Sequence, residues 1–140
     1  MKKINLTIAF LAFFVLVSGC TFNTQKITIQ KRVSNTNIYE DYKEVTQNKQ
    51  VKTAIEIVEN ADWENKGLEI INFPDYKFQF PFKYDEVTKI ASYSLWINLN
   101  GKNLEIVTDS DKYVRLGKQD STELFEVLVG ETLEKLYVII

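Results

Sequence analysis

The run YKFQFPFKY, from Tyr76 to Tyr84, alternates aromatic side chains with polar residues and one proline. Alternation with a period of two is typical of a β-strand, so all five rings are expected on one face of an extended segment. Because proline donates no hydrogen bond to a sheet, this strand is expected at a sheet edge, or to end near Pro81. Five exposed rings would leave much apolar area in water, so we interpret the stripe as facing the core. The alternative is a stacking platform for a sugar or peptidoglycan strand.

A second alternating run, at residues 92–99, predicts another strand. Its two sides carry Tyr93, Leu95 and Ile97, and Ser92, Ser94 and Trp96. If the first set faces the core, Trp96 faces solvent or a groove, and exposed tryptophan is a frequent binding anchor. The alternatives are that both faces of the sheet are covered, or that a β-bulge reverses which side chains face the core. The dipeptide Asn100-Gly101 predicts a type I′ hairpin turn after this strand, because that turn needs positive φ at both central residues.

Two segments show the 3.6-residue period of amphipathic helices. The apolar face of the first consists of Val51, Ala54, Ile55, Val58 and Ala61, and that of the second of Leu124, Phe125 and Leu128. Gly130 is a natural end for the second helix. Further strands are expected at 26–30, 68–73, 104–108 and 113–116. We therefore predict an α+β fold: a mostly antiparallel sheet of five or six strands with two helices packed on it.

The N-terminus has the pattern of a signal sequence. Lys2 and Lys3 precede an apolar run at residues 8–17, which is too short to remain as a membrane span. The tetrapeptide Val17-Ser18-Gly19-Cys20 follows and resembles the lipobox of bacterial lipoproteins. In that family the cysteine thiol receives a diacylglyceryl group and the chain is cut before the cysteine.

This pattern predicts three regions along the chain. Residues 1–19 are expected to be a cleaved lipoprotein signal peptide, residues 20–25 a lipidated tether, and residues 26–140 a single domain. Two acyl chains on Cys20 give stable membrane anchoring, whereas one gives only marginal binding. The alternative is an ordinary secretory signal that leaves Cys20 as a free thiol.

The composition excludes several classes of function. Of 17 basic and 19 acidic residues, Lys2 and Lys3 lie in the signal, so the mature chain carries 15 and 19, a net charge of −4. This balance argues against a nucleic-acid partner, because nucleic-acid binding depends on basic patches. The chain has no histidine, so the commonest general base and transition-metal ligand is missing. We therefore expect no metal site, no cofactor and no enzymatic activity.

Four segments together resemble the YhfM-like domain of small lipoproteins from Bacillus and related Gram-positive bacteria. They are Asn60-Ala61-Asp62-Trp63-Glu64, Phe73-Pro74-Asp75-Tyr76-Lys77-Phe78, Ser92-Tyr93-Ser94-Leu95-Trp96-Ile97 and Tyr113-Val114-Arg115-Leu116. The resemblance covers about Ile27 to Leu128. It implies an extracytoplasmic, lipid-anchored α+β domain and implies no particular activity.

The residues singled out for binding are Trp96, Asp75 and Tyr76. Asp75 follows Pro74, so it is read either as a ligand-binding carboxylate or, more simply, as a turn residue that bonds its own backbone. Asp109 and Asp111 supply too few oxygens for calcium and are interpreted as a solvated turn. For the apolar end, residues 131–140, three alternatives stay open: packing back on the domain, extending the helix, or meeting a partner.

Two functions follow as expectations. The first is a binding or interaction module, held by its lipid at the extracytoplasmic face of the cell membrane, that engages an envelope protein or polymer. The second is a cell-envelope hydrolase that uses carboxylates such as Asp75 and Glu86. The second requires the two carboxyl groups to lie within about 10 Å of each other in a concave pocket.

Overall fold

The computed structural model of the protein describes residues 25–65 and 72–138. The strands are β1 (Ile27–Arg32), β2 (Tyr39–Val45), β3 (Tyr76–Tyr84), β4 (Val87–Ile97), β5 (Leu104–Thr108) and β6 (Tyr113–Arg115). The helices are α2 (Asn48–Glu59), α3 (Lys118–Val129) and the short α4 (Lys135–Val138).

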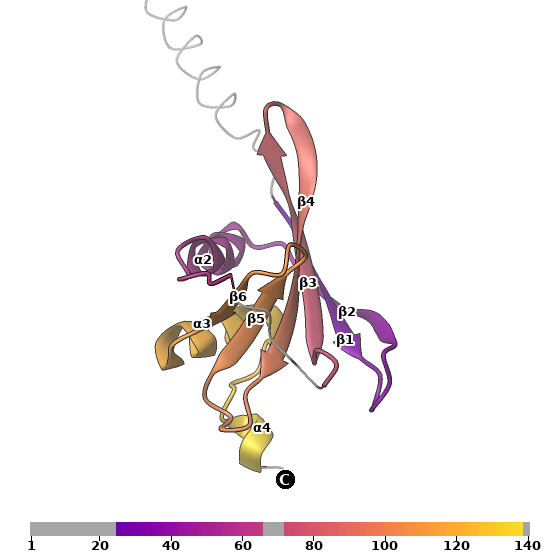
Figure 1. Cartoon of the computed structure of the whole chain (residues 1–140), viewed down its shortest axis with the longest axis vertical. Coiled ribbons are helices and arrows are strands. Elements are labelled where there is room, and N and C mark those ends of the chain that lie inside the picture. Colours follow the sequence, from indigo (N-terminus) through magenta and orange to yellow (C-terminus); the bar gives the residue numbers. More distant parts are fainter. Residues whose placement is uncertain (1–24, 66–71, 139–140) are drawn as a thin grey trace, which may run out of the picture.

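All six strands form one sheet in the order β2-β1-β3-β4-β5-β6, and every neighbouring pair is antiparallel. Helices α2 and α3 lie side by side against the same face of this sheet (Figure 1). The predicted α+β class is thereby confirmed, with six strands. Most of the strand expected at residues 68–73 lies outside the described residues, and Asn72 and Phe73 precede β3 without belonging to a strand.

The core lies between this face and the two helices. Tyr76, Phe78 and Phe80 of β3 are buried in it, which confirms the interpretation of the aromatic stripe for these three rings. The ring of Tyr93 in β4 stacks on Phe78 and Phe80, with centroid distances of 4.9 and 5.6 Å. Tyr84, at the far end of the same stripe, is exposed, because β3 and β4 continue beyond the helices as a projecting hairpin (Figure 1).

Pro81 lies inside β3, so the expectation of an edge strand, or of a strand that ends near the proline, is wrong. The reason for that expectation still holds, because no neighbouring strand needs the N–H that Pro81 lacks. β1 pairs with β3 only from Tyr76 to Gln79, and beyond Gln79 the paired neighbour is β4. The C=O of Pro81 accepts a hydrogen bond from Nε2 of Gln25 at 2.9 Å, on the β1 side. Because the N and C=O of a strand residue point to the same side, the missing donor of Pro81 faces away from β4.

The β3–β4 hairpin closes through Asp85 and Glu86, whose φ angles are 48° and 64°. Tyr84 pairs directly with Val87, so two residues with positive φ make the turn, as in type I′ geometry. The sequence favours this turn at Asn100-Gly101, and there the expected type is wrong.

The β4–β5 connection is a longer loop, residues 98–103, and only its Gly101 has a positive φ, 69°. Asparagine side chains hold this loop in place of a tight turn. Oδ1 of Asn98 accepts a hydrogen bond from the N–H of Asn100, and Oδ1 of Asn100 accepts one from the N–H of Lys102. Side-chain acceptors of this kind stabilise loops that lack a backbone ladder.

The apolar faces of both helices are close to those predicted. In α2 the buried residues are Val51, Ala54, Ile57 and Val58, while the predicted Ile55 and Ala61 are partly buried against the core. In α3 the predicted Leu124, Phe125 and Leu128 are buried. Gly130 ends α3 with φ 81°, a left-handed conformation that glycine adopts without steric cost.

The chain after Gly130 packs back on the domain. Leu133 is buried and Leu136, at the start of α4, packs against the core. Of the three alternatives for residues 131–140, packing back is therefore observed as far as Leu136. Residues 139–140 lie outside the described range.

One buried hydroxyl fastens α3 to the sheet. Ser121 is completely buried, and its Oγ accepts a hydrogen bond from the N–H of Leu104 in β5 at 2.9 Å. The same hydroxyl donates to the C=O of Leu116 at 3.2 Å. A buried backbone N–H without an acceptor is costly, so this side chain fixes how α3 sits on β5.

Replacing this hydroxyl gives a direct test of its structural role. We expect Ser121→Ala to lower the free energy of unfolding by about 1–3 kcal/mol, because the N–H of Leu104 loses its acceptor. The control is Thr122→Ala, whose hydroxyl bonds only the C=O of Lys118 within the same helix. Urea denaturation measures both, and equal effects of the two substitutions would contradict this role for Ser121.

Candidate functional site

The face of the sheet opposite α2 and α3, which we call the open face, carries mainly polar side chains. On the three central strands these are Thr28, Gln30, Lys77, Gln79, Ser92, Ser94 and Trp96. The register aligns Thr28, Gln79 and Ser92 in one row, and Gln30, Lys77 and Ser94 in the next. No helix of the described chain covers these rows, so hydroxyl and amide groups lie side by side on an accessible surface.

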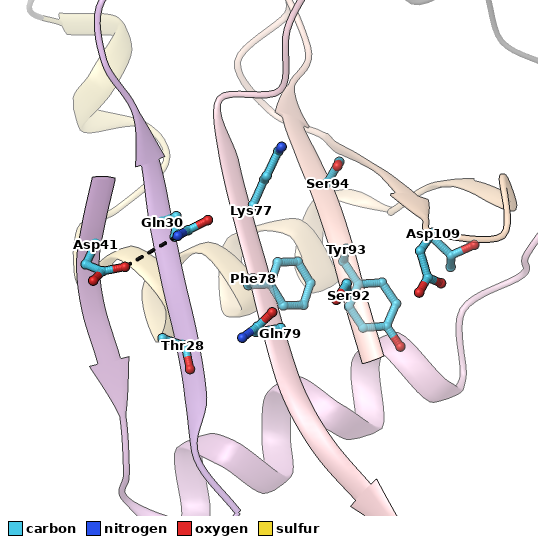
Figure 2. A pocket seen from close by; sticks show the side chains of 11 residues that line it. Thr28, Gln30, Asp41, Lys77, Phe78, Gln79, Ser92, Tyr93, Ser94 and Asp109 are labelled. Carbon is cyan, nitrogen blue, oxygen red and sulfur yellow. Dashed lines mark hydrogen bonds between the residues drawn. The ribbon is translucent and has the colours of Figure 1, made fainter. Parts of the chain in front are cut away.

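A shallow groove with a cavity volume of about 300 Å³ lies over these rows (Figure 2). Asp41 of β2 lies at one side of it, and Thr108 and Asp109 at the other. Nε2 of Gln30 donates a hydrogen bond to Oδ1 of Asp41 at 3.4 Å. This volume is at the lower end of the range for small-ligand sites. The polar groups of the groove suit a ligand that donates and accepts hydrogen bonds.

The charged groups of the groove are spread apart. Nζ of Lys77 lies 4.2 Å from the ring centroid of Tyr39, a cation–π contact that holds the ammonium group over β2. Asp41 and Asp109 belong to opposite sides of the groove. Four strand spacings separate them, about 19 Å, whereas paired carboxylates in glycoside hydrolysis lie at most about 9.5 Å apart. The groove therefore offers hydrogen-bonding groups without a pair of cooperating acids.

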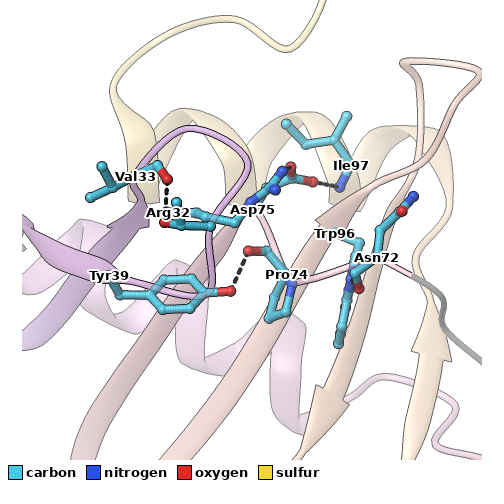
Figure 3. A network of polar contacts seen from close by, with 9 residues as sticks. Arg32, Val33, Tyr39, Asn72, Pro74, Asp75, Trp96 and Ile97 are labelled. Atoms are coloured by element: carbon cyan, nitrogen blue, oxygen red, sulfur yellow. Dashed lines mark hydrogen bonds and ion pairs between the residues drawn. The ribbon is translucent and has the colours of Figure 1, made fainter.

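At one end of the open face, Asp75 joins three segments of the chain (Figure 3). Its Oδ1 accepts a hydrogen bond from the Arg32 guanidinium at 3.2 Å, and its Oδ2 accepts one from the N–H of Ile97 at 2.8 Å. The side chains of Arg32 and Asp75 are 21% and 31% exposed. Beside them, the hydroxyl of Tyr39 donates to the C=O of Pro74 at 2.6 Å.

Both carboxylate oxygens of Asp75 are thus engaged by the ends of β1 and β4. The contact to Ile97 is not the local Asx turn considered from sequence, because its donor comes from a different strand. A ligand-binding role for Asp75 stays a prediction, and any ligand there would compete with Arg32 and Ile97.

Asp75 and Glu86 do not form the pair that the hydrolase hypothesis requires. Asp75 precedes β3 and Glu86 follows it in the hairpin turn. The nine residues of β3 separate the two by about 30 Å. No shared pocket can hold both carboxyl groups.

Trp96 lies on the open face, as its alternation with Leu95 predicts. Its side chain is half-buried, and its Nε1 donates a hydrogen bond to the C=O of Asn72 at 2.8 Å (Figure 3). Trp96 is therefore neither fully exposed nor on a covered face. The face is open, but the segment that leads into β3 covers part of the indole. Trp96 is next to the groove, two residues from Ser94.

Tyr76 is a core residue. Its side chain is 5% exposed and its ring packs edge-on against Phe125 of α3, with centroids 6.2 Å apart. Burial is the main reason that the pKa of Tyr76 rises to about 12, so the hydroxyl stays protonated at neutral pH. A surface ligand cannot reach this ring, and the structure gives no support to its predicted binding role.

Asp109 and Asp111 lie in the β5–β6 turn, where the N–H of Thr108 donates to the C=O of Lys112. Within residues 25–65 and 72–138, no three acidic or cysteine side chains gather as a metal site would require. Cys20 lies outside the described residues, so its lipidation stays a prediction. None of the helices in these two ranges is both long enough and apolar enough to span a bilayer.

Sequence reasoning named Trp96 and missed the rows of polar residues beside it. The signal was present, because Lys77 and Gln79 alternate with the aromatic stripe, and Ser92 and Ser94 alternate with Tyr93 and Leu95. What the sequence lacks is the register that places Gln79 between Thr28 and Ser92. Register is a long-range property: Thr28 and Gln79, which it places side by side, are more than fifty residues apart in the chain.

The fold and the open face define this chain as a small single-sheet α+β domain with one covered and one polar face. A comparison with protein families matches residues 21–134 to the family described as YhfM protein. The chain belongs to the YhfM family, which confirms the resemblance seen in the sequence. A search of curated proteins found no match.

One solved structure has a similar fold, a thioesterase-like protein from Clostridium sporogenes ATCC 15579. The TM-score is 0.52 at 11% sequence identity, and the alignment covers 76% of this chain and 94% of that one. At this identity the likeness shows a shared fold alone.

The role of Asp75 can be tested by removing its carboxylate. We expect Asp75→Ala to lower the free energy of unfolding by about 1–3 kcal/mol, because the N–H of Ile97 and the Arg32 guanidinium lose their acceptor. The control is Glu44→Ala, which removes a carboxylate from an ion pair with Lys26 whose two side chains are 52% and 54% exposed. Such exposed pairs contribute about 0–1 kcal/mol. Urea denaturation at neutral pH gives both values, and a cost for Asp75→Ala no larger than that for Glu44→Ala would contradict the structural role.

Proposed function

We propose that the protein is an extracytoplasmic lipoprotein, anchored through Cys20 in the cell membrane, that acts as a non-catalytic binding module. Its open face binds a polar polymer of the cell envelope through hydroxyl and amide groups. The observation that carries the proposal is the accessible double row of polar side chains beside the half-buried Trp96.

Membrane anchoring is supported by the N-terminal sequence. Lys2 and Lys3, the apolar run at 8–17 and the lipobox-like Val17-Ser18-Gly19-Cys20 occur in the order that lipoprotein processing requires. The family match begins at residue 21, directly after the proposed acylated cysteine. The chain between Cys20 and the start of β1 is short, so the domain stays close to the bilayer.

A binding role on the open face is supported by its chemistry. Most groups in the two rows are hydroxyls and amides, which match neutral polar groups such as the hydroxyls and amides of a glycan strand with peptide stems. Trp96 adds an aromatic edge of the kind that anchors ligands at interfaces. The net charge of −4 for the mature chain makes a strongly anionic polymer a poorer partner.

A carboxylate hydrolase, the alternative considered from sequence, gains no support from the geometry. Asp75 and Glu86 lie at opposite ends of β3, and Asp41 and Asp109 at opposite sides of the groove. With no histidine in the chain, acid–base arrangements that use an imidazole are also missing. Binding without catalysis is the reading these residues favour.

The anchor is tested with Cys20→Ser in the full-length chain. We expect the wild-type protein to fractionate with membranes and its N-terminal peptide to carry a diacylglyceryl group by mass spectrometry. The variant lacks the thiol that accepts the lipid, so it is expected to be unmodified at residue 20. A wild-type protein with an unmodified thiol at residue 20 would contradict the anchor.

The open face is tested by co-sedimentation with purified cell-wall sacculi. We expect Gln79→Ala combined with Ser92→Ala to weaken binding roughly thirtyfold, because two hydrogen bonds of about 1 kcal/mol each are lost. The matched control, Gln119→Ala with Thr122→Ala, removes an amide and a hydroxyl from α3 and should leave binding unchanged. Trp96→Ala in the same assay shows whether the groove extends to the indole. Absence of wild-type binding, or equal loss in the control, would count against a wall polymer as the ligand.

A further inference from the structure

The β3–β4 hairpin projects beyond the rest of the described domain (Figure 1). All residues from Lys83 to Ile90 are exposed. Among them are three large apolar side chains, Tyr84, Val87 and Ile90, which are 59%, 57% and 51% exposed. We call Tyr84, Val87 and the turn between them, Asp85 and Glu86, the hairpin tip; Ile90 lies farther back on β4, where it pairs with Pro81. No other element of the described chain packs against it, so the fold itself does not explain its apolar character.

The tip lies at the end of the molecule where the described chain begins. β1 runs antiparallel to β3, with Thr28 paired to Gln79, so the N-terminal end of β1 points toward the hairpin. Gln25 is already beside the hairpin, because its Nε2 donates a hydrogen bond to the C=O of Pro81 at 2.9 Å. The segment that leads back to Cys20 therefore starts next to the hairpin.

The lengths of the two segments agree. From Pro81 to the turn at Asp85 the hairpin extends by four residues, about 13 Å. From Gln25 back to Cys20 there are five residues, which span at most about 17 Å when extended. Acyl chains on Cys20 can thus enter a bilayer at the level of the hairpin tip, and they cannot lie much beyond it.

From this geometry we propose that the hairpin tip is a membrane-contact surface, which rests in the lipid headgroup layer when the acyl chains of Cys20 are inserted. The inference rests on the proposed anchor at Cys20. The occupant is the lipid bilayer itself, and the contact orients the open face relative to the membrane.

The side chains of the tip suit an interfacial position. Tyrosine is favoured at membrane interfaces because its ring is apolar and its hydroxyl stays hydrated. Nζ of Lys89 lies 4.8 Å from the centroid of the Tyr84 ring, so a cation accompanies the aromatic ring at the level of lipid phosphates.

The turn residues Asp85 and Glu86 limit the depth, because carboxylates are costly in hydrocarbon. Lys83 and Lys89 balance their charge, so the contact does not depend on anionic lipid.

The opposite end of the domain also has exposed apolar residues, Ile38, Phe73 and Leu99. They lie in three separate connections, and the tether does not reach them. Gln25 is seven residues from Arg32 at the far end of β1, about 23 Å along the strand, which exceeds the reach of the tether. The anchor therefore favours the hairpin end over this one.

The experiment uses the acylated mature protein reconstituted in vesicles of phosphatidylethanolamine and phosphatidylglycerol. Cys20 is the only cysteine and its thiol is blocked when acylated, so Val87→Cys accepts a single fluorescent label at the tip. Asn35→Cys places the control label in the exposed β1–β2 turn at the far end. Lipids with a nitroxide near the top of the acyl chain act as the quencher.

We expect several-fold stronger quenching of the label at residue 87 than at residue 35, with little change when the phosphatidylglycerol fraction varies. Adding Tyr84→Asp to Val87→Cys should reduce the quenching toward the control while the protein stays bound to the vesicles. Circular dichroism checks that this double variant, which changes only exposed residues, is folded.

Equal quenching of the two labels in vesicle-bound protein would overturn the hairpin contact and leave the anchor intact. If the label at residue 87 were shielded from solvent in native membranes but not quenched in vesicles that contain no other protein, a protein partner would cover the tip. That result would also overturn the membrane contact. Labelling at Cys20, together with failure to bind vesicles, would overturn the anchor and this inference with it.

Discussion

The strict alternation of side chains along β3 is the constraint on which the other features of the domain depend. β3 pairs with β1 on one side and β4 on the other, and its Tyr76, Phe78 and Phe80 are buried in the core. Because successive side chains of a strand point to opposite faces, the residues between them must face the other way. Burying the aromatic rings under α2 and α3 therefore places Lys77 and Gln79 on the open face. The covered face and the polar groove both depend on β3, so a one-residue change in its register would exchange the side chains of both faces.

The two halves of β3 differ in their neighbouring strands. Its first half pairs on both sides and lies under helices, and its second half, from Pro81 onward, pairs only with β4 and projects from the domain. Proline is compatible with this change because its missing donor faces the side where β1 no longer pairs. The same aromatic stripe thus serves two environments: Phe78 and Phe80 are buried, while Tyr84 is exposed. In the proposed orientation the projecting half meets the membrane surface.

The two ends of the sheet differ in how they are stabilised. At the far end, Asp75 ties β1 to β4 through Arg32 and the N–H of Ile97, so its carboxylate is occupied in holding strands together. At the hairpin end, backbone pairing between β3 and β4, the two-residue turn and the cation–π contact of Lys89 with Tyr84 hold the structure. The groove lies between these ends and contains neither a pair of close acids nor a histidine. The binding role that we propose rests on the accessible polar rows of this groove, and the low-identity fold likeness to a thioesterase-like protein adds no chemistry to it.

The sequence by itself determined the local features: the alternation in β3 and β4, the apolar faces of α2 and α3, the glycine stop at residue 130 and the face on which Trp96 lies. Each depends on residues a few positions apart, so periodicity reveals it. Only the tertiary structure decided that β3 is central, that Gln79 lies between Thr28 and Ser92, and that Asp75 bonds Arg32 and Ile97. It also decided that the tight turn falls at Asp85-Glu86, where strand pairing places Glu86 as well as Asp85 at positive φ. These features join segments that are distant in the chain, and their free energy comes from pairing and burial that no short stretch of sequence contains.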